Sequence, residues 1–144
     1  MKISTRGRYG IRLLIDLAEH VGESHVPLAS VAERQAVSIR YLEQVAVILR
    51  RSGFIRSVKG ASGGYTLARS PQDIIIGDAL RELEGDMLVV DPPLIHTTET
   101  KLQRCIRVTV FDRLNDRIAG VIDRKTLASV VGTVDPDESY MYFI

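Results

Sequence analysis

The chain has 144 residues, of which 45% are hydrophobic, so it is long enough for one domain with a buried core and an added interaction element. Its apolar runs are too short for a membrane span, and its first residues lack the apolar segment of a secretory signal, so we expect no membrane association. A single cysteine excludes an intramolecular disulfide, which is typical of the cytoplasm, and the net charge of +1 excludes neither a basic nor an acidic partner.

The first 53 residues predict three helices. Residues 4–21 have the periodicity of an amphipathic helix, and residues 27–33 predict a short helix with Pro27 near its start. After a turn at residues 34–37, a longer helix begins at its cap Ser38 and ends before Gly53. Its predicted buried stripe consists of Ile39, Leu42, Val45, Ala46 and Leu49.

Residues 54–70 predict a β-hairpin. Two alternating segments rich in β-forming residues, 54–60 and 64–70, flank a glycine-rich tip. Residues 71–85 then begin with an apolar run and become a helix with Asp78 in its first turn.

The rest of the chain predicts a loop and more helix. Residues 86–104 contain two adjacent prolines and little periodicity, which indicates a loop. Residues 105–124 are amphipathic again, residues 125–132 predict a short helix, and residues 133–144 form an acidic and then aromatic tail. The apolar stripe of the amphipathic helix consists of Val108, Phe111, Leu114, Ile118, Val121 and Ile122.

The predicted elements follow the order of a winged helix-turn-helix: a helix, a short helix, a turn, a longer helix and a hairpin. In this geometry the N-terminal part of the second helix of the motif enters the major groove of DNA, where Arg reads guanine, Gln reads adenine and Glu accepts from cytosine. Its outward residues, our candidates for DNA contact, are Ser38, Arg40, Tyr41, Glu43 and Gln44. A solvent-exposed helix face would carry similar residues.

Charge distribution favours the DNA-binding reading. Residues 1–70 contain 11 Lys and Arg against 5 Asp and Glu, a net charge of +6, whereas residues 71–144 contain 8 against 13, a net charge of −5. Such an asymmetry favours a polyanion as the partner of the first half, although two solvated faces with a chance imbalance would look the same.

The glycine-rich stretch RSVKGASGGYTLAR, residues 56–69, has three interpretations. A nucleotide-binding loop, and with it a nucleotide-dependent enzyme, requires a helix after the glycines, but a strand is predicted there. A plain hairpin turn would need glycine for its geometry alone. We favour a DNA-contacting wing, in which Lys59, Ser62 and Gly63 approach phosphates through charge and backbone amides.

Four stretches also carry a family resemblance: MKISTRGRYGIRLLIDLA, VPLASVAERQAVSIRYLEQVAVILRRSGFIRSVKGASGGYTLAR, IIIGDALRELEG and KTLASVV. Together they resemble the winged-helix regulators of iron–sulfur assembly, nitric oxide response and cysteine metabolism, the IscR, NsrR and CymR group. The resemblance covers nearly the whole chain. It implies a mainly α fold with a small β-hairpin, in which a winged helix-turn-helix domain is followed by a long dimerisation helix.

The resemblance further implies how the protein acts. It implies a homodimeric transcription factor, expected to be a repressor and not an enzyme, that binds a pseudo-palindromic operator with half-sites about 34–36 Å apart or a multiple of that. The long helix would pair with its mate through the six-residue stripe. Thr5, Arg6 and Arg8 match positions that meet the DNA backbone. We expect a DNA-binding domain at residues 1–85, a sensor loop at 86–104 and a dimerisation helix with its tail at 105–144.

The lone Cys105 bears on the signal that is sensed. Cluster-binding relatives carry three cysteines before the dimerisation helix, and Cys105 matches the third, while Pro93 and Glu99 occupy the other two positions and Val108 that of a histidine ligand. We therefore expect no iron–sulfur cluster and no other cofactor or metal. Two readings of Cys105 stay open: a small buried residue, and a redox-sensing thiol whose pKa a helix N-terminus and neighbouring arginines would lower.

The tail residues ESYMYF resemble those of the cysteine-metabolism regulators, which act by binding cysteine synthase. The leading hypothesis is therefore a regulator of sulfur or iron–sulfur metabolism that senses a protein partner. The alternatives are a redox sensor or cluster sensor that uses Cys105, and a protein-interaction module that no longer binds DNA.

Overall fold

A computed structural model describes residues 1–132. Within that range every helix is too short or too polar to span a bilayer. The elements are α1 (Thr5–Glu19), α2 (Leu28–Gln35), α3 (Ile39–Arg51), β1 (Ile55–Val58), β2 (Gly64–Leu67), a 3₁₀ turn η1 (Pro71–Asp73), α4 (Ile76–Glu84), α5 (Lys101–Ile106), a π-helical segment η2 (Arg107–Phe111), α6 (Asp112–Ile122) and α7 (Leu127–Val130).

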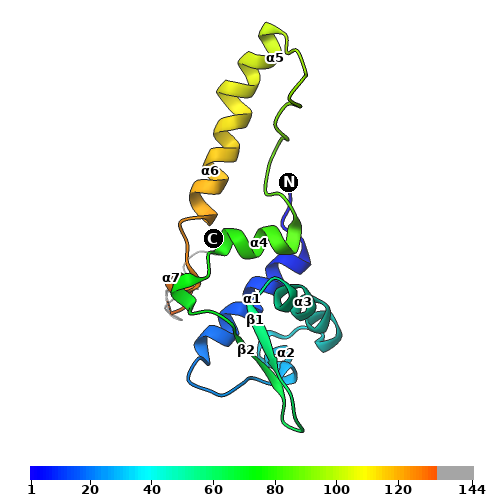
Figure 1. Ribbon diagram of the computed structural model, residues 1–144, viewed down its shortest axis with the longest axis vertical. Coiled ribbons are helices and arrows are strands. Elements are labelled where there is room, and N and C mark those ends of the chain that lie inside the picture. Colours follow the sequence, from blue (N-terminus) through cyan, green and yellow to red (C-terminus); the bar gives the residue numbers. More distant parts are fainter. Residues whose placement is uncertain (133–144) are drawn as a thin grey trace, which may run out of the picture.

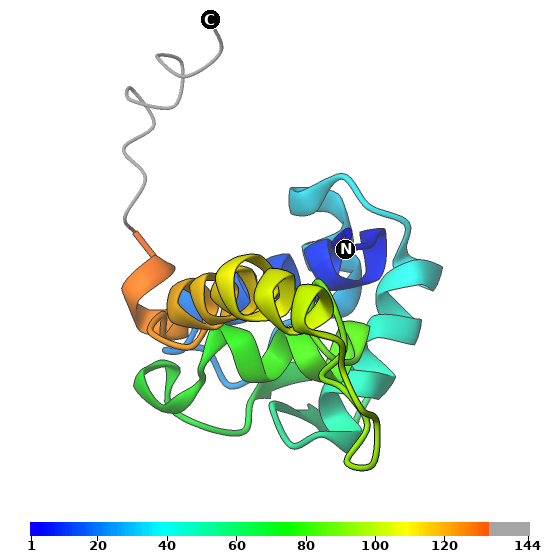
Figure 2. The same cartoon turned by 90° about the horizontal axis from the view of Figure 1, so that it is seen from above.

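The molecule has two parts (Figure 1). Helices α1–α4 and the hairpin form a rounded part, from which the hairpin projects at one end. At the other end α5, η2 and α6 join into one long helix, and the segment after α4 runs beside it; seen from above, this helix lies over α4 (Figure 2). The mainly α fold with one two-stranded antiparallel sheet is thus confirmed.

The core lies where α1, α3, α4 and the hairpin meet. Leu14, Leu42 and Leu49 are almost completely buried, as expected from their periodicity. Leu13 of α1 is also fully buried, because α3 and α4 both pack against α1 and widen its buried face. One residue differs from the predicted stripe of α3. Ile39 is 43% exposed, because as the first residue of α3 it lies at the edge of that helix's apolar face.

The long helix starts earlier than its periodicity predicts. It begins at Lys101, because the side chain of Thr100 accepts a hydrogen bond from the amide of Gln103, and the Gln103 side chain accepts one from the amide of Thr100. This capping box ends the preceding loop at Thr100 instead of residue 104. The T-x-x-Q pattern was visible in the sequence but lies within the segment that its prolines marked as a loop.

The segment after the long helix returns to the rounded part of the molecule. Leu127 of α7 is fully buried in the main core, and its amide donates to the carbonyl of Ile74 at 2.8 Å. At the base of the long helix, Arg81 of α4 makes a bidentate ion pair with Asp123, at 2.8 and 2.9 Å. Helix α7 therefore packs with the rounded part of the molecule, although it follows the long helix in the chain.

Candidate nucleic-acid interface

Helices α2 and α3 form a helix-turn-helix. Helix α2 ends two residues later than predicted, at Gln35, where Ala36 takes the left-handed conformation with φ 52° and its amide donates to the carbonyls of Ala32 and Glu33. Helix α3 starts after Ser38, whose hydroxyl oxygen accepts a hydrogen bond from the amide of Tyr41 at 3.5 Å. This N-cap confirms the predicted start of the second helix of the motif.

The outer face of α3 carries most of the residues proposed to read bases. Ser38, Arg40, Glu43 and Gln44 are exposed, whereas Tyr41 is only half-exposed. The Tyr41 ring packs edge-on against Tyr9 of α1, with ring centroids 5.4 Å apart and an interplanar angle of 86°. Tyr41 thus helps to attach α3 to α1, a role that the helix pattern alone did not indicate.

A buried carboxylate lies behind the motif. Asp16 of α1 is 1% exposed and accepts hydrogen bonds from Arg34 at 2.6 and 3.0 Å and from Gln35 at 3.0 Å. Burial by itself raises the pKa of Asp16, but these hydrogen bonds and the charge of Arg34 outweigh it, so the pKa lies below its usual value. Arg12 adds a hydrogen bond to the Gln35 side chain at 3.0 Å and another to the Gln35 carbonyl.

This network joins α1 to the end of α2 and so positions the helix-turn-helix. Sequence reasoning did not assign it a role. Its signal was an acidic residue, Asp16, between the apolar residues Ile15 and Leu17 of an amphipathic helix, since a charge in such a place usually has a partner.

The hairpin pairs Ile55 with Leu67 and Val58 with Gly64, and at its tip Lys59 and Ser62 are exposed. The Gly63 amide donates to the carbonyl of Gly60 at 3.0 Å, so it is engaged within the tip and is not a free phosphate ligand.

The last glycine of the tip is required by packing. A Cβ atom on Gly64 would lie 2.3 Å from the Val26 carbonyl oxygen. Next to it, Tyr65 and Val26 exchange two backbone hydrogen bonds, at 2.8 and 2.9 Å, which attach the base of the hairpin to the segment before α2. Glycine is therefore needed here for close backbone approach, as in the plain-turn reading, while Lys59 supplies the charge expected of a wing.

The start of α1 lies near the start of α3, because Tyr9 contacts Tyr41. Arg6 and Arg8 are exposed and Thr5 is half-buried. The carboxylate of Glu84 accepts hydrogen bonds from the hydroxyl of Ser4 at 2.6 Å and from the amides of Ser4 and Gly7 at 2.9 Å each. Glu84 already accepts the hydrogen bonds of these amides, so the end of the helix cannot donate them to a DNA phosphate. The side chains of Arg6 and Arg8 can bind a phosphate here.

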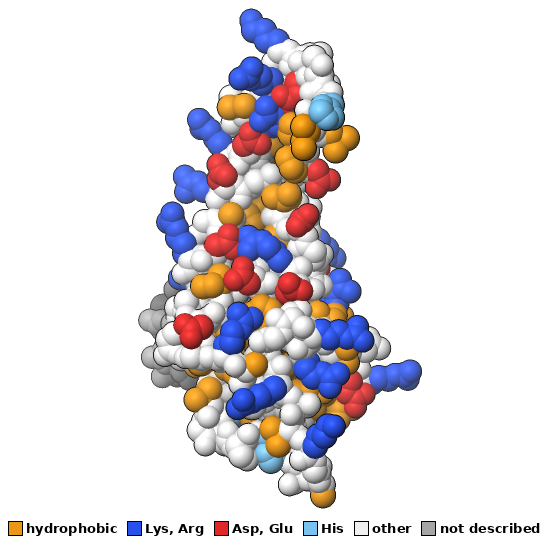
Figure 3. Space-filling model, in the orientation of Figure 1, with side chains coloured by type: hydrophobic (Ala, Val, Ile, Leu, Met, Phe, Trp, Pro, Cys, Tyr) orange, Lys and Arg blue, Asp and Glu red, His pale blue; other side chains and the backbone are white. Residues whose placement is uncertain are grey.

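Basic side chains lie over the rounded part of the molecule on the visible face, and a row of them also follows one edge of the long helix (Figure 3). Acidic side chains on this face lie mainly along the long helix and at its base. Residues 101–124, which form the long helix and its end, contain six Lys and Arg against three Asp and Glu, so the acidic excess of the second half of the sequence does not lie on this helix.

The predicted dimer stripe divides into two sets. Val108, Leu114 and Val121 are exposed by 48%, 43% and 63%, whereas Ile118 and Ile122 pack against the protein's own core. Phe111 is half-buried and faces the loop. The π-helical segment η2 adds one residue to a turn, and this rotates the residues before it relative to those after it. Further exposed apolar residues on the same long helix are Leu102, Ile106 and Val110.

The position of Cys105 fits neither of its two interpretations completely. It is exposed, so it is not a buried packing residue. It follows the helix cap Thr100 by five residues, so it lies inside the long helix and not at a helix N-terminus. A redox role for this thiol stays a hypothesis based on its exposure.

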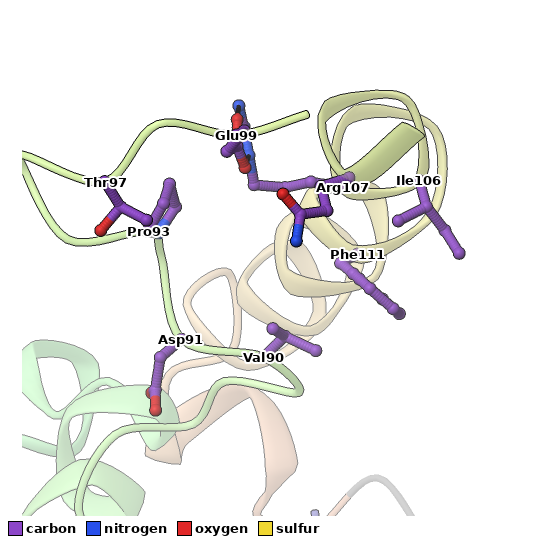
Figure 4. Close-up of a pocket in the computed structure, with 9 residues that line it drawn as sticks. Val90, Asp91, Pro93, Thr97, Glu99, Ile106, Arg107 and Phe111 are labelled. Atoms are coloured by element: carbon purple, nitrogen blue, oxygen red, sulfur yellow. Dashed lines mark hydrogen bonds and ion pairs between the residues drawn. The ribbon is translucent and has the colours of Figure 1, made fainter. Parts of the chain in front are cut away.

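A salt bridge joins the loop to the long helix next to Cys105. Glu99 and Arg107 form a bidentate ion pair at 2.6 and 2.8 Å, and Arg107 also contacts Asp112 at 2.8 Å. The hydrogen bond from Arg107 lowers the pKa of Glu99 below its usual value. Glu99 and Arg107 together line a cavity of about 280 Å³ between the loop and the helix, which is lined also by Val90 and Phe111 (Figure 4).

The residues around this cavity do not fit an iron–sulfur cluster. Cys105 is the single thiol of the chain, and Glu99 is already bound by Arg107. Within residues 1–132, no group of three or more His, Cys, Asp or Glu side chains has the arrangement of a metal site.

Comparison with known proteins decides the family. The family model Rrf2, described as "Iron-dependent Transcriptional regulator", matches residues 3–133. The chain belongs to the Rrf2 family. It is 37% identical to the HTH-type transcriptional regulator CymR of Bacillus subtilis over 145 residues, which covers 100% of both chains. It is 34% identical to the HTH-type transcriptional regulator IscR of Serratia proteamaculans, over 94% of this chain and 82% of the relative.

The solved structures agree. The structure of CymR, the global cysteine regulator of B. subtilis, superposes with a TM-score of 0.79 at 36% identity, over 94% of this chain and 99% of CymR. The resemblance drawn from the sequence is thus confirmed, and this Rrf2-family protein is a DNA-binding transcriptional regulator of the helix-turn-helix type. Because its relatives are named transcriptional regulators, the hypothesis of a nucleotide-dependent enzyme is dropped.

Proposed function

We propose that this Rrf2-family protein is a cytoplasmic homodimeric repressor that binds a pseudo-palindromic operator. In each subunit α3 lies in the major groove and the hairpin reaches the adjacent minor groove. The observation that carries the proposal is the exposed polar face of α3, which follows the end of α2 that the buried carboxylate of Asp16 binds.

Each group of exposed residues has a role in this proposal. Four side chains of the recognition helix, Ser38, Arg40, Glu43 and Gln44, face base edges, while Tyr41 contributes its half-exposed ring edge. The wing contacts phosphates through Lys59 and Ser62, and the start of α1 does so through Arg6 and Arg8, with Thr5 beside them. Gly63 contributes through the shape of the tip.

The test is operator binding by the full chain. A duplex selected from a random library should bind the dimer, and its affinity should fall steeply as salt rises. Arg40→Ala should weaken binding by about 1–3 kcal/mol and relax specificity at one base pair. Lys59→Ala should reduce the slope of log affinity against log salt concentration by about 1 for each phosphate that the wing no longer neutralises.

The matched control is Arg124→Ala, which removes an exposed arginine just after the C-terminal end of α6, outside the helix-turn-helix and the hairpin. It should bind the operator as the unchanged protein does. If no duplex is enriched, or if the Arg40 and Lys59 variants bind like the control, DNA recognition by this surface is disproved.

We further propose that the signal reaches the loop of residues 86–100 from a protein partner and not from a cluster. The engagement of Glu99 by Arg107 supports this, because it leaves Cys105 as a lone ligand. The partner class implied by the resemblance is cysteine synthase, and the tail that suggested it, residues 133–144, lies outside the described residues.

Two measurements test whether the signal comes from a protein partner or from a cluster. Calorimetric titration of the regulator with cysteine synthase should give saturable binding, and protein purified without oxygen should contain no stoichiometric iron and no visible absorbance. A flat titration would disprove the partner. Brown protein with about two irons per chain would disprove the cluster-free regulator.

A further inference from the structure

Ile39 is an apolar side chain in an unusual place. It is the first residue of α3, directly after the cap Ser38, and it is 43% exposed. The other large aliphatic residues of α3 are buried or half-buried. An exposed Ile at a helix start contributes little to the core, and β-branched residues are poorer helix formers than Ala. Folding therefore gives no reason for Ile at this position.

The surroundings of Ile39 are those of a base-reading surface. Ile39 is followed by the exposed Arg40 and lies one helical turn before the exposed Glu43, so the three side chains share the outer edge of α3. The N-terminal residues of such a helix contact base edges. Among the groups in the major groove, the C5-methyl of thymine is the one that favours an apolar side chain.

We propose that Ile39 is a specificity-determining residue that packs against the C5-methyl group of one thymine in each half-site. This inference rests on the proposed function, because it requires α3 to lie in the major groove. Ile39 adds an apolar contact to a helix whose other candidate contacts are polar, so the preferred half-site contains a thymine next to the bases read by Arg40 and Glu43.

The experiment removes the methyl group from the DNA and the side chain from the protein. In the selected operator, each thymine of one half-site is replaced singly by deoxyuridine, which deletes the C5-methyl and leaves base pairing intact. Binding of each duplex is measured for the unchanged chain, for Ile39→Ala, and for Val21→Ala. Val21 is another exposed apolar residue, 54% exposed, that lies outside α3 and the hairpin.

For the unchanged chain and for Val21→Ala, one uracil substitution should weaken binding roughly three- to five-fold, the effect of leaving about one methyl group unburied. Ile39→Ala should bind the thymine operator roughly 10- to 25-fold more weakly, because the apolar packing is removed in both subunits of a dimer. In the variant the same uracil substitution should have no further effect. Because Ile39 is exposed, the melting temperature of the variant should stay within a few degrees of that of the unchanged chain.

Two outcomes would overturn the inference. In one, each uracil substitution weakens binding by the same factor in the Ile39→Ala variant as in the unchanged chain, so the changes in DNA and protein act independently. In the other, Ile39→Ala binds the thymine operator normally. Either result leaves the DNA-binding function standing, whereas failure of that function would be seen separately as the absence of any enriched duplex.

Discussion

The carboxylate of Asp16 in α1 accepts two hydrogen bonds from the guanidinium of Arg34 in α2, at 2.6 and 3.0 Å. Asp16 is 1% exposed, while the Arg34 side chain is 39% exposed. One end of the pair is therefore in the protein interior and the other reaches water. The pair joins the first helix to the last turn of α2, so it helps to position the helix-turn-helix.

Asp16→Asn should lower the free energy of unfolding by about 2 kcal/mol, because a charge-assisted hydrogen bond at a buried site is removed. Arg34 limits the loss of stability, since its exposed part can turn to water. The measurement is urea denaturation at pH 7. Glu33→Gln, which neutralises an exposed carboxylate on α2, should change the value by less than about 0.5 kcal/mol. Equal stability of the two variants would contradict the role given to Asp16.

The stabilisation by Asp16 should depend on pH. Burial raises the pKa of Asp16, but hydrogen bonds from Arg34 and Gln35 and nearby positive charge lower it by more, so the folded-state pKa lies below the unfolded value of about 3.9. The stabilisation is then fully present above about pH 4 and is lost as pH falls through the folded-state pKa. Denaturation from pH 7 to pH 3 should show the unchanged chain and Asp16→Asn converging at the acid end. A constant difference across this range would rule out the titration.

Gly64→Ala should destabilise the protein by about 1–3 kcal/mol, the usual cost of overpacking. The added Cβ would meet the backbone of Val26 and Pro27, which cannot rotate away as a side chain can. Gly22→Ala is the control, because nothing lies within 4 Å of its Cβ position. Thermal melts compare the two, and a Gly64 variant as stable as the control would show that the hairpin base tolerates a wider spacing.

Glu99→Gln should loosen the loop more than it destabilises the fold. The Glu99–Arg107 pair lies near the surface, where an ion pair contributes little to the stability of the fold. It nevertheless joins the loop to the long helix, so amide hydrogens of residues 88–100 should exchange faster in the variant. Asp91→Asn, an exposed carboxylate on the same loop, is the control. Unchanged exchange in the Glu99 variant would mean that other contacts, such as those of Asn115 with Val89 and Val90, suffice to hold the loop.

Leu114→Glu should convert a dimer into folded monomers. Leu114 is 43% exposed in the single chain, so a charge there harms folding little but would be costly in an apolar contact between two long helices. Sedimentation equilibrium gives the oligomeric state, and circular dichroism verifies the fold. Val21→Glu places the same charge at an exposed apolar residue outside this helix and should remain dimeric. A dimeric Leu114 variant would move the interface elsewhere.

Cys105 illustrates where the sequence was insufficient. Its neighbours suggested a helix start, but the capping box of Thr100 and Gln103 begins the helix earlier. Whether a residue lies at the end or inside a helix changes the local field and therefore the chemistry of a thiol. Predicting a helix boundary to within a few residues is accurate enough to identify the fold. It is not accurate enough to decide the environment of a single thiol.

By itself the sequence determined the order of helices, the helix-turn-helix, the hairpin and the basic first half, because periodicity, caps and glycines act between residues a few positions apart. Only the tertiary structure decided which residues meet across long separations. Ser4 meets Glu84, Gly64 meets Val26, and Leu127 returns to the first core. Such contacts arise from packing of whole elements against each other, and no local pattern encodes them.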